Sequence, residues 1–439
     1  MNKKKPTFYI SCPIDTYSGY GARARDLVSA LIDLEKYDVK IVPQKWGSTP
    51  WGFIEDNPEW APLKDLFVTQ ITERPDIWAQ ITIPSEFKPI GTYNIGITAG
   101  IEATVCSPDW IEGLNRMDVN FVSSTHSKEI FESLRFEKKH KETQQVMGMI
   151  EVTKPIEVLF EGVDTSTYKK KDKVPKDFLN LGEIKEDFAF LHCGMWLEGI
   201  IGEDRKNIGL TIKAFYETFK NKSKKPALLL KVSAGSSSYM SRDKILAKIA
   251  AVKKTVKSKN LPNVYLLNGD LTDEEMNDLY NHPKVKAMIS LTKGEGFGRP
   301  LLEFTTSQKP LITTNWSGQL DYLNPEFTTL LKGELTNIHP SAANQWLLKE
   351  GQWFSVDFMQ AGGYLRDVFE NYKKYKIMAK RQARISTTEF SWDKMKDLLG
   401  TRLDELLPVF PEHVELKLPK LSLPKLKKPE LSLPKLKKN

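Results

Sequence analysis

The chain has 439 residues, which is too long for one hydrophobic core and predicts two domains. A composition of 40% hydrophobic and 27% charged residues is ordinary for a soluble globular protein, and no apolar run is long enough to cross a membrane. The apolar run behind the basic N-terminus is too short for a secretion signal. Three scattered cysteines indicate reduced thiols, and no cysteine–histidine cluster has metal-ligand spacing. We therefore expect a cytoplasmic protein without a metal site.

Most of the positive charge belongs to a C-terminal tail. The net formal charge is +8, and eight lysines and one glutamate between Leu416 and Asn439 contribute +7, which leaves +1 for the rest of the chain. Composition therefore does not indicate a basic groove for nucleic acid in the body, although a local patch stays open.

The first half of the chain alternates apolar strands with helices. A turn from Asp15 to Gly21 is expected to lead into a helix whose apolar positions run from Ala24 to Leu34. Strands that alternate with helices predict a parallel sheet covered on both faces. The expected strands are residues 9–13, 39–43, 78–83, 93–98 and 119–123.

A second series of the same kind follows a charged segment without a period, residues 169–186, which is the predicted linker. A helix start with a capping pattern is expected at Asp270–Met276, and the residues from Phe390 to Leu406 form an amphipathic segment. The expected strands are residues 188–194, 227–232, 264–269, 285–291 and 310–314.

The most informative segment is Lys293–Glu303, in which Glu295 and Glu303 flank a glycine-rich turn and a predicted helix start. A strand, a tight turn and a helix point backbone N–H groups at an anion, and carboxylates accept hydrogen bonds from hydroxyls. The segment therefore fits a polyol attached to a phosphate, as in a sugar nucleotide. A glycine-rich turn with nearby glutamates, taken alone, fits an ordinary strand-to-helix connection equally well.

The whole segment resembles the glutamate–seven–glutamate motif of retaining glycosyltransferases of the two-Rossmann (GT-B) type, especially family 4 (glycosyl transferases group 1). The resemblance implies that Glu295 contacts hydroxyls of the donor sugar and that Glu303 contacts the ribose hydroxyls of a UDP- or GDP-type donor. It also implies that the turn at Asp270 holds the nucleobase through backbone contacts. Backbone contacts to the sugar and diphosphate are implied around Gly296, Phe297, Gly298, Leu301 and Leu302.

Two basic residues, Arg205 and Lys206, precede the helix expected around Ile212. The resemblance implies that Lys206 neutralises the donor diphosphate, with Arg205 beside it. Met195 occupies a place where the family often has arginine, so one phosphate cation is missing or is supplied by Arg205 or Arg299. Without the neighbouring motif, the pair would fit an ordinary surface position.

Two glycines, Gly19 and Gly21, lie in the turn after the first strand. By resemblance they lie over the cleft between the domains, near the donor phosphate and the acceptor. The alternative is a tight turn that needs glycine for its backbone. For three polar residues near strand ends, we expect a capping or solvated role rather than a catalytic one: Glu102, Asp109 and His126.

We therefore expect an α/β fold of two Rossmann-like domains that face a cleft. Residues 1–170 are the predicted acceptor-side domain, 171–386 the donor-binding domain, 387–410 a crossover helix and 411–439 a Lys/Pro/Leu tail. Proline at every fifth position of the tail forbids a helix. The tail is interpreted as a tether to an anionic membrane, a nucleic acid or a protein groove, with a disordered solubilising end as the alternative.

The implied reaction moves a hexose-like sugar from a nucleoside diphosphate to a hydroxyl of a glycan, protein or nucleic acid. The anomeric configuration is retained, and neither a metal nor a cofactor takes part. Two alternatives remain at this point: a glycosyltransferase that acts on modified DNA bases, and a non-catalytic module that binds sugar nucleotides or glycans.

Overall fold

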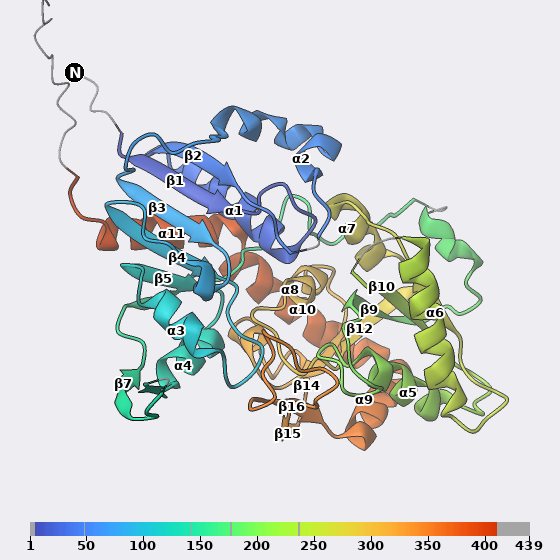
Figure 1. Cartoon of the computed structure of the whole chain (residues 1–439). Coiled ribbons are helices and arrows are strands. Elements are labelled where there is room, and N and C mark those ends of the chain that lie inside the picture. Colours follow the sequence, from blue (N-terminus) through green and yellow to red (C-terminus); the bar gives the residue numbers. More distant parts are fainter. Residues whose placement is uncertain (1–4, 48, 141, 176–177, 236–237, 411–439) are drawn as a thin grey trace, which may run out of the picture. The chain divides into compact units, whose positions relative to one another are not determined.

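Two parallel sheets of six strands each organise the chain (Figure 1). The computed structural model describes residues 5–47, 49–140, 142–175, 178–235 and 238–410, and Lys5–Pro408 form one compact unit. The strand orders are β2-β1-β3-β4-β5-β8 and β11-β10-β9-β12-β13-β14. Every neighbouring pair in both sheets is parallel. The predicted α/β fold with two Rossmann-like halves is therefore confirmed.

Five strands of the first sheet lie where the apolar runs predicted them, and the sixth, at Ile156–Val158, was not among the expected strands. Its strands are β1 Thr7–Cys12, β2 Asp38–Pro43, β3 Ile77–Ile81, β4 Tyr93–Thr98, β5 Val119–Val122 and β8 Ile156–Val158. The connecting helices are α1 Gly19–Asp33, α2 Phe53–Asp56, α3 Pro108–Leu114 and α4 Thr125–Ser133. An antiparallel hairpin, β6 Phe136–Lys139 and β7 Val146–Ile150, extends from this half.

The second sheet has the same construction. Its strands are β9 Ala189–Met195, β10 Ala227–Ser233, β11 Val264–Leu267, β12 Val285–Ser290, β13 Leu311–Thr314 and β14 Thr329–Leu331. Its helices are α5 Ile208–Phe219, α6 Tyr239–Lys254, α7 Asp273–Asn281, α8 Arg299–Thr305, α9 Phe358–Glu370 and α10 Tyr372–Glu389. A second hairpin pairs β15 Gly333–Asn337 with β16 Gln352–Val356.

Helices bury both faces of the second sheet. Along β10, Leu228 and Leu230 belong to one hydrophobic cluster, together with Phe215 of α5. Leu229 belongs to the other cluster, together with Leu302 of α8. Because side chains of a strand alternate between the two faces of a sheet, an unbroken apolar run such as Ala227–Leu230 is what a strand covered on both faces requires.

The turn after β1 is shorter than predicted. Gly19 and Gly21 were expected in a turn that reached Gly21, but they lie in the first turn of α1. The reason is a cap: the Ser18 side chain accepts a hydrogen bond from the backbone N–H of Gly21 at 2.9 Å, so the helix begins directly after Ser18.

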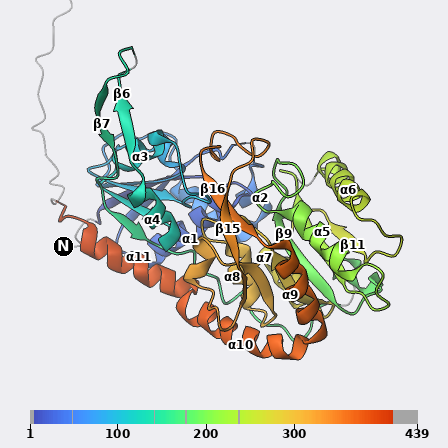
Figure 2. The same ribbon diagram turned by 90° about the horizontal axis from the view of Figure 1, so that it is seen from below.

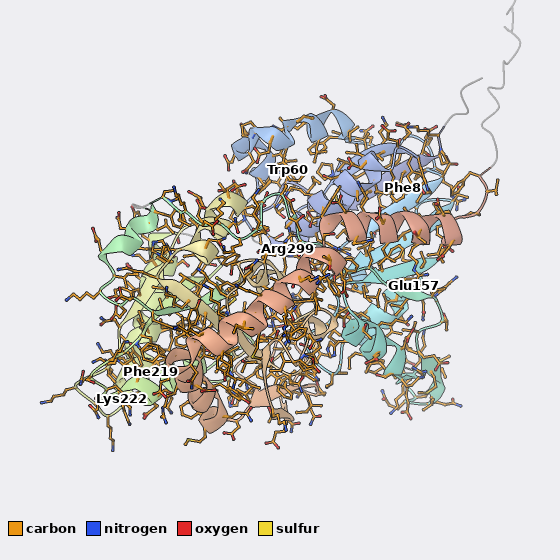
Figure 3. The ribbon with its side chains drawn as sticks, turned by 180° about the vertical axis from the view of Figure 1, so that it is seen from behind. Phe8, Trp60, Glu157, Phe219, Lys222 and Arg299 are labelled. Atoms are coloured by element: carbon orange, nitrogen blue, oxygen red, sulfur yellow. The ribbon has the colours of Figure 1, made fainter. Side chains whose placement is uncertain are left out.

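The last helix, α11 Trp392–Leu406, packs against α1, and α10 packs against α8 (Figure 2). Gly162 lies against this helix start, since a Cβ on Gly162 would fall 2.6 Å from the Cα of Trp392. Arg299, at the start of α8, lies where these segments meet (Figure 3). The domain limits at residues 170 and 386 stay predictions, and the predicted tail lies outside the described residues.

No helix in the described part of the chain has both the length and the apolarity needed to cross a bilayer.

Candidate functional site

The glycine-rich turn between β12 and α8 is buried and closely packed. Gly298 has φ +90°, a left-handed conformation that glycine adopts without strain, and it ends the turn directly before α8. A Cβ on Gly296 would lie 2.3 Å from the carbonyl oxygen of Ala99, which follows β4. Glycine at these positions therefore lets the turn change direction and approach the backbone of the first half.

Glu295 lies at the centre of a cluster of cations. Lys206 Nζ donates to Glu295 Oε1 and Oε2 at 2.6 and 2.7 Å, and Arg205 Nη1 lies 3.5 Å from Oε2. The Glu295 side chain is only 8% exposed. Burial opposes ionisation of Glu295, but Lys206 and Arg205 outweigh it and hold the pKa of the carboxyl below its ordinary value. The three residues that we predicted to be catalytic thus lie together.

Arg205 fastens the loop before α5 to the glycine-rich turn. Its Nη1 donates to the Gly294 carbonyl at 2.8 Å, and its own carbonyl accepts from Lys293 N–H at 2.8 Å. Its Nη2 pairs with Glu102 at 3.4 Å. Glu102, whose side chain is 39% exposed as a solvated role requires, therefore also joins the cluster from the first half of the chain.

Glu303 lies in a different network. Its Oε1 accepts from Arg299 Nε at 2.8 Å, and its Oε2 lies 3.4 Å from the Tyr280 hydroxyl. Arg299 also pairs with Asp26 of α1. Burial raises the pKa of Glu303 to about 7, although Arg299 opposes the shift. The two motif glutamates therefore meet different cations: Lys206 with Arg205 for Glu295, and Arg299 for Glu303.

The backbone around the motif is held by a strained serine that the sequence did not single out. Ser317 has φ 73° and ψ −162°, a region that residues other than glycine rarely adopt. Its Oγ accepts from Glu295 N–H at 2.9 Å, and Gly318 N–H donates to the Glu295 carbonyl at 3.0 Å. Strain of this kind persists where surrounding contacts impose it, which is common at functional sites.

The other predicted positions surround these two networks. Phe297, Leu301 and Leu302 are buried in the hydrophobic cluster under the turn. Their side chains pack inside this cluster, while their backbone atoms form part of the turn and of the start of α8. Tyr20, between Gly19 and Gly21, accepts from Ala99 N–H at 3.1 Å. The start of α1 therefore touches the same loop that approaches Gly296.

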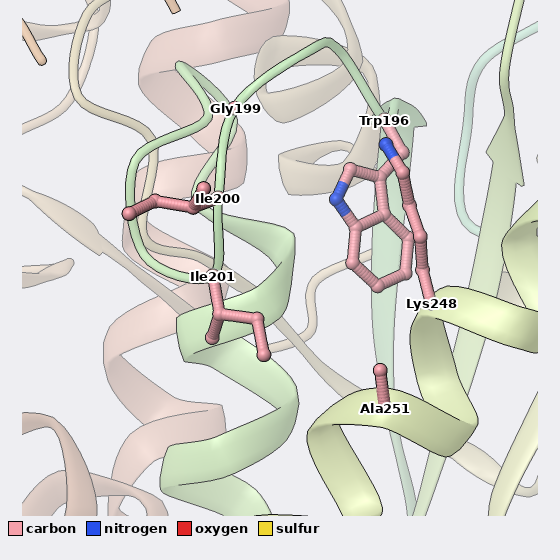
Figure 4. A pocket seen from close by; sticks show the side chains of 6 residues that line it. All are labelled: Trp196, Gly199, Ile200, Ile201, Lys248 and Ala251. Carbon is pink, nitrogen blue, oxygen red and sulfur yellow. The ribbon is translucent and has the colours of Figure 1, made fainter. Parts of the chain in front are cut away.

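Two of the pockets formed by the described residues lie in the second half of the chain. The larger, about 470 Å³, lies between the loop after β9 and α6 and is lined by Trp196, Gly199, Ile200, Ile201, Lys248 and Ala251 (Figure 4). The smaller, about 190 Å³, lies at the turn after β11, where the nucleobase contact was predicted. Its lining consists of residues 266–269 with Leu179, Lys231 and Leu271. Across the described residues, no group of three or more His, Cys, Asp and Glu side chains is arranged to hold a metal ion.

Residues 203–348, about a third of the chain, match the family model of glycosyl transferases group 1. This segment contains Arg205, Lys206, the glycine-rich turn and α8. The chain carries a group 1 glycosyltransferase domain. The prediction of a glycosyltransferase is thereby confirmed, and the motif glutamates fall inside the matched segment of the group 1 domain.

Solved structures share the fold of this glycosyltransferase over nearly its whole length. A glycosyltransferase from Rickettsia africae aligns with a TM-score of 0.62 at 14% identity and covers 93% of this chain and 99% of its own. Sucrose-phosphate synthase from Thermosynechococcus elongatus gives 0.60 at 12%, covering 92% and 99%. HepE from Anabaena, in complex with UDP-glucose, gives 0.55 at 13%, covering 91% and 100%. At these identities the likeness establishes the GT-B fold. No curated protein sequence matches the chain.

Proposed function

We propose that this glycosyltransferase moves a hexose-like sugar from a nucleoside diphosphate to an acceptor hydroxyl, with retention of the anomeric configuration and without a metal ion. The observation that carries the proposal is the convergence of Lys206 and Arg205 on Glu295 beside the glycine-rich turn. Two cations beside a carboxylate suit a donor that presents a diphosphate next to sugar hydroxyls. HepE, which shares the fold, binds UDP-glucose.

In the proposed reaction, the bond between the anomeric carbon and the phosphate oxygen breaks while a bond to the acceptor oxygen forms. Lys206 and Arg205 stabilise the negative charge that develops on the departing diphosphate. Glu295 exchanges its contacts with these cations for hydrogen bonds from the sugar hydroxyls. The acceptor proton leaves with the diphosphate oxygen, so no side chain is assigned as a general base.

In this scheme, Lys206 and Arg205 provide the main electrostatic stabilisation of the departing diphosphate. Helix α8 has only seven residues, which limits the contribution of its dipole to anion binding. The turn after β11, with its small pocket, is the proposed place of the nucleobase. A metal ion is not needed to neutralise the diphosphate when two cations are already present, so activity is expected to survive chelation by EDTA.

The decisive experiment measures nucleoside diphosphate release by mass spectrometry from an equimolar mixture of UDP-, GDP- and ADP-sugars. Glycan, protein and hydroxymethylated DNA acceptors are supplied in separate reactions, and Glu295→Ala is the control. Release of one nucleotide by the wild type, and not by Glu295→Ala, supports the proposal and names the donor. If no donor releases a nucleotide or raises the melting temperature, the enzyme proposal is wrong, and a non-catalytic module that binds glycans replaces it.

A further inference from the structure

Arg299 links the donor half of the chain to the first half. Its guanidinium meets two carboxylates, since Nη1 pairs with Asp26 Oδ2 and Nε donates to Glu303 Oε1 at 2.8 Å. The side chains of Arg299, Asp26 and Glu303 are 18%, 14% and 8% exposed. Asp26 lies on α1 and Glu303 on α8, so a row of buried charges runs from one half of the molecule to the other.

The shape of the guanidinium makes the two ion pairs depend on each other. A guanidinium is planar and presents its N–H groups at fixed angles. The orientation that Asp26 selects through Nη1 therefore also determines where Nε points. Glu303 follows Nε through its Oε1. The direction of its second oxygen, which also lies 3.4 Å from the Tyr280 hydroxyl, therefore depends in part on Asp26.

The charge of Glu303 also depends on this contact. Burial raises the pKa of Glu303 to about 7, and Arg299 is the cation that opposes the shift. An ionised carboxylate accepts hydrogen bonds from hydroxyls more strongly than a neutral carboxyl does. A misplaced guanidinium would therefore weaken Glu303 as an acceptor in two ways, through its direction and through its charge.

Asp26 is itself held in place by the last helix. Trp392 Nε1, at the start of α11, donates to the backbone carbonyl of Asp26 at 3.2 Å. One turn earlier on α1, Arg23 Nη1 donates to the Phe160 carbonyl at 2.7 Å. These contacts fasten the turn of α1 that carries the Asp26 carboxylate, so its position is well defined.

We infer that Asp26 is a positioning residue of the donor site: through Arg299 it orients Glu303 toward the ribose hydroxyls of the donor. The inference gives Asp26 no contact with the donor or with the reacting atoms. The inference rests on the proposed function and extends it to a residue in the half of the chain that was assigned to the acceptor.

The test compares a nucleoside diphosphate with its 2′,3′-dideoxy form. Isothermal titration first identifies which of UDP, GDP and ADP binds the wild type most tightly. The affinity ratio of that nucleotide to its dideoxy analogue then measures the contribution of the ribose hydroxyls. A hydrogen bond to a carboxylate predicts a ratio of about ten or more for the wild type. Glu303→Gln supplies the reference value for a lost carboxylate.

Asp26→Asn is expected to lower this ratio to near the value of Glu303→Gln while it leaves binding of the dideoxy analogue almost unchanged. The matched control is Asp33→Asn, because Asp33 lies on the same helix and pairs with Lys396 of α11 at 3.3 Å, away from Glu303. Asp33→Asn should keep the wild-type ratio.

An unchanged ratio in Asp26→Asn overturns the inference, as does an equal loss of affinity for both nucleotides, which a purely structural role would produce. If Asp26→Asn does not fold, the double variant Asp26→Asn/Arg299→Leu removes both buried charges, and a wild-type ratio in that variant overturns the inference as well. Failure of the wild type to bind any of the three nucleotides overturns the proposed function and this inference with it.

Discussion

Lys206 and Glu295 hold each other through two short hydrogen bonds in a nearly buried site. Breaking one partner away from such a pair leaves a buried charge without compensation, which is costly. A donor diphosphate can nevertheless replace Glu295 as the partner of Lys206, because it offers the same negative charge. Sugar hydroxyls can likewise replace Lys206 as donors to Glu295. In the proposed reaction, both charges of the pair would therefore stay compensated while their partners change.

Replacing Lys206 by Ala is expected to lower donor turnover by about a hundredfold or more, which corresponds to about 3 kcal/mol of lost transition-state stabilisation. The measurement is nucleotide release at saturating donor, with the melting temperature recorded in parallel. Lys36→Ala, which removes an exposed ion pair with Asp404, serves as the control and should leave turnover unchanged. Near-normal turnover in Lys206→Ala would remove this lysine from the mechanism.

Affinity for the donor is expected to depend on pH through Glu303. Burial raises the pKa of Glu303 to about 7, so the carboxyl is ionised above this pH and gains a proton below it. Because the ionised form is the better acceptor, affinity should be highest above pH 7 and should decrease as the pH falls through 7. Titration with UDP-glucose from pH 5.5 to 8.5 measures this dependence. A profile that keeps its midpoint in Glu303→Gln would assign the dependence to another group.

At the scale of secondary-structure elements, short-range patterns predicted the motif and ten of the twelve strands of the two sheets, all except β8 and β14. An apolar run such as Ala227–Leu230 has one stable arrangement in a sheet that is buried on both faces, so its position follows from local composition. The capping pattern before α7 was also correct: Thr272 accepts from Glu275 N–H, and the Glu275 side chain accepts from Thr272 N–H.

The sequence did not predict contacts between residues that lie far apart in the chain, nor helices with few buried residues. The contact between Arg299 and Asp26 joins residues that are 273 positions apart, and no local pattern connects Arg299 of the motif with Asp26. Helix α6 was missed because only Ser241, Ile245 and Val252 are buried along it, too few to produce a helical period. The spacing of Arg299 four residues before Glu303 was a signal that could have revealed their pairing.

The two glycines of α1 are expected to differ sharply when replaced by alanine. A Cβ on Gly19 meets no atom within 4 Å, whereas a Cβ on Gly21 would lie 2.3 Å from the Thr16 carbonyl oxygen. Gly19→Ala should therefore be neutral or stabilising by up to about 1 kcal/mol, and Gly21→Ala should be destabilising, because the backbone of Thr16 must move. Chemical denaturation of both variants measures the difference. Equal stabilities would contradict the packing at Gly21.

Removal of the α7 cap should cost stability without affecting catalysis. Thr272→Ala deletes the side chain that accepts from Glu275 N–H and is expected to destabilise the chain by about 1 kcal/mol. The denaturation midpoint and nucleotide release are the two measurements. Thr272→Ser retains the hydroxyl and should behave like the wild type. Loss of turnover in Thr272→Ala at a temperature where the chain is folded would give this turn a direct part in catalysis.

At the scale of the whole molecule, charge is distributed unevenly along the chain. Residues before Leu416 carry a net charge of only +1 of the total +8. Any salt-sensitive affinity for anionic surfaces is therefore expected to depend on residues 411–439, and to decrease steeply as ionic strength rises. This affinity is measured by sedimentation with anionic vesicles and by gel shifts with DNA. Each experiment compares the full chain with a variant in which the tail lysines are replaced by glutamine. Equal binding by both proteins would assign the affinity to the body.

The packing of α11 against α1 has a consequence for biosynthesis. Helix α1 leaves the ribosome long before its partner α11, since Lys36, just after α1, pairs with Asp404 of α11 across 368 positions. The face of α1 that α11 covers thus stays open until α11 has been synthesised, and Asp26 gains its contact with Trp392 only after that. A nascent chain that stops short of residue 392 would contain every residue predicted to contact the donor. It would still lack α11, the helix that holds the Asp26 turn of α1 in place.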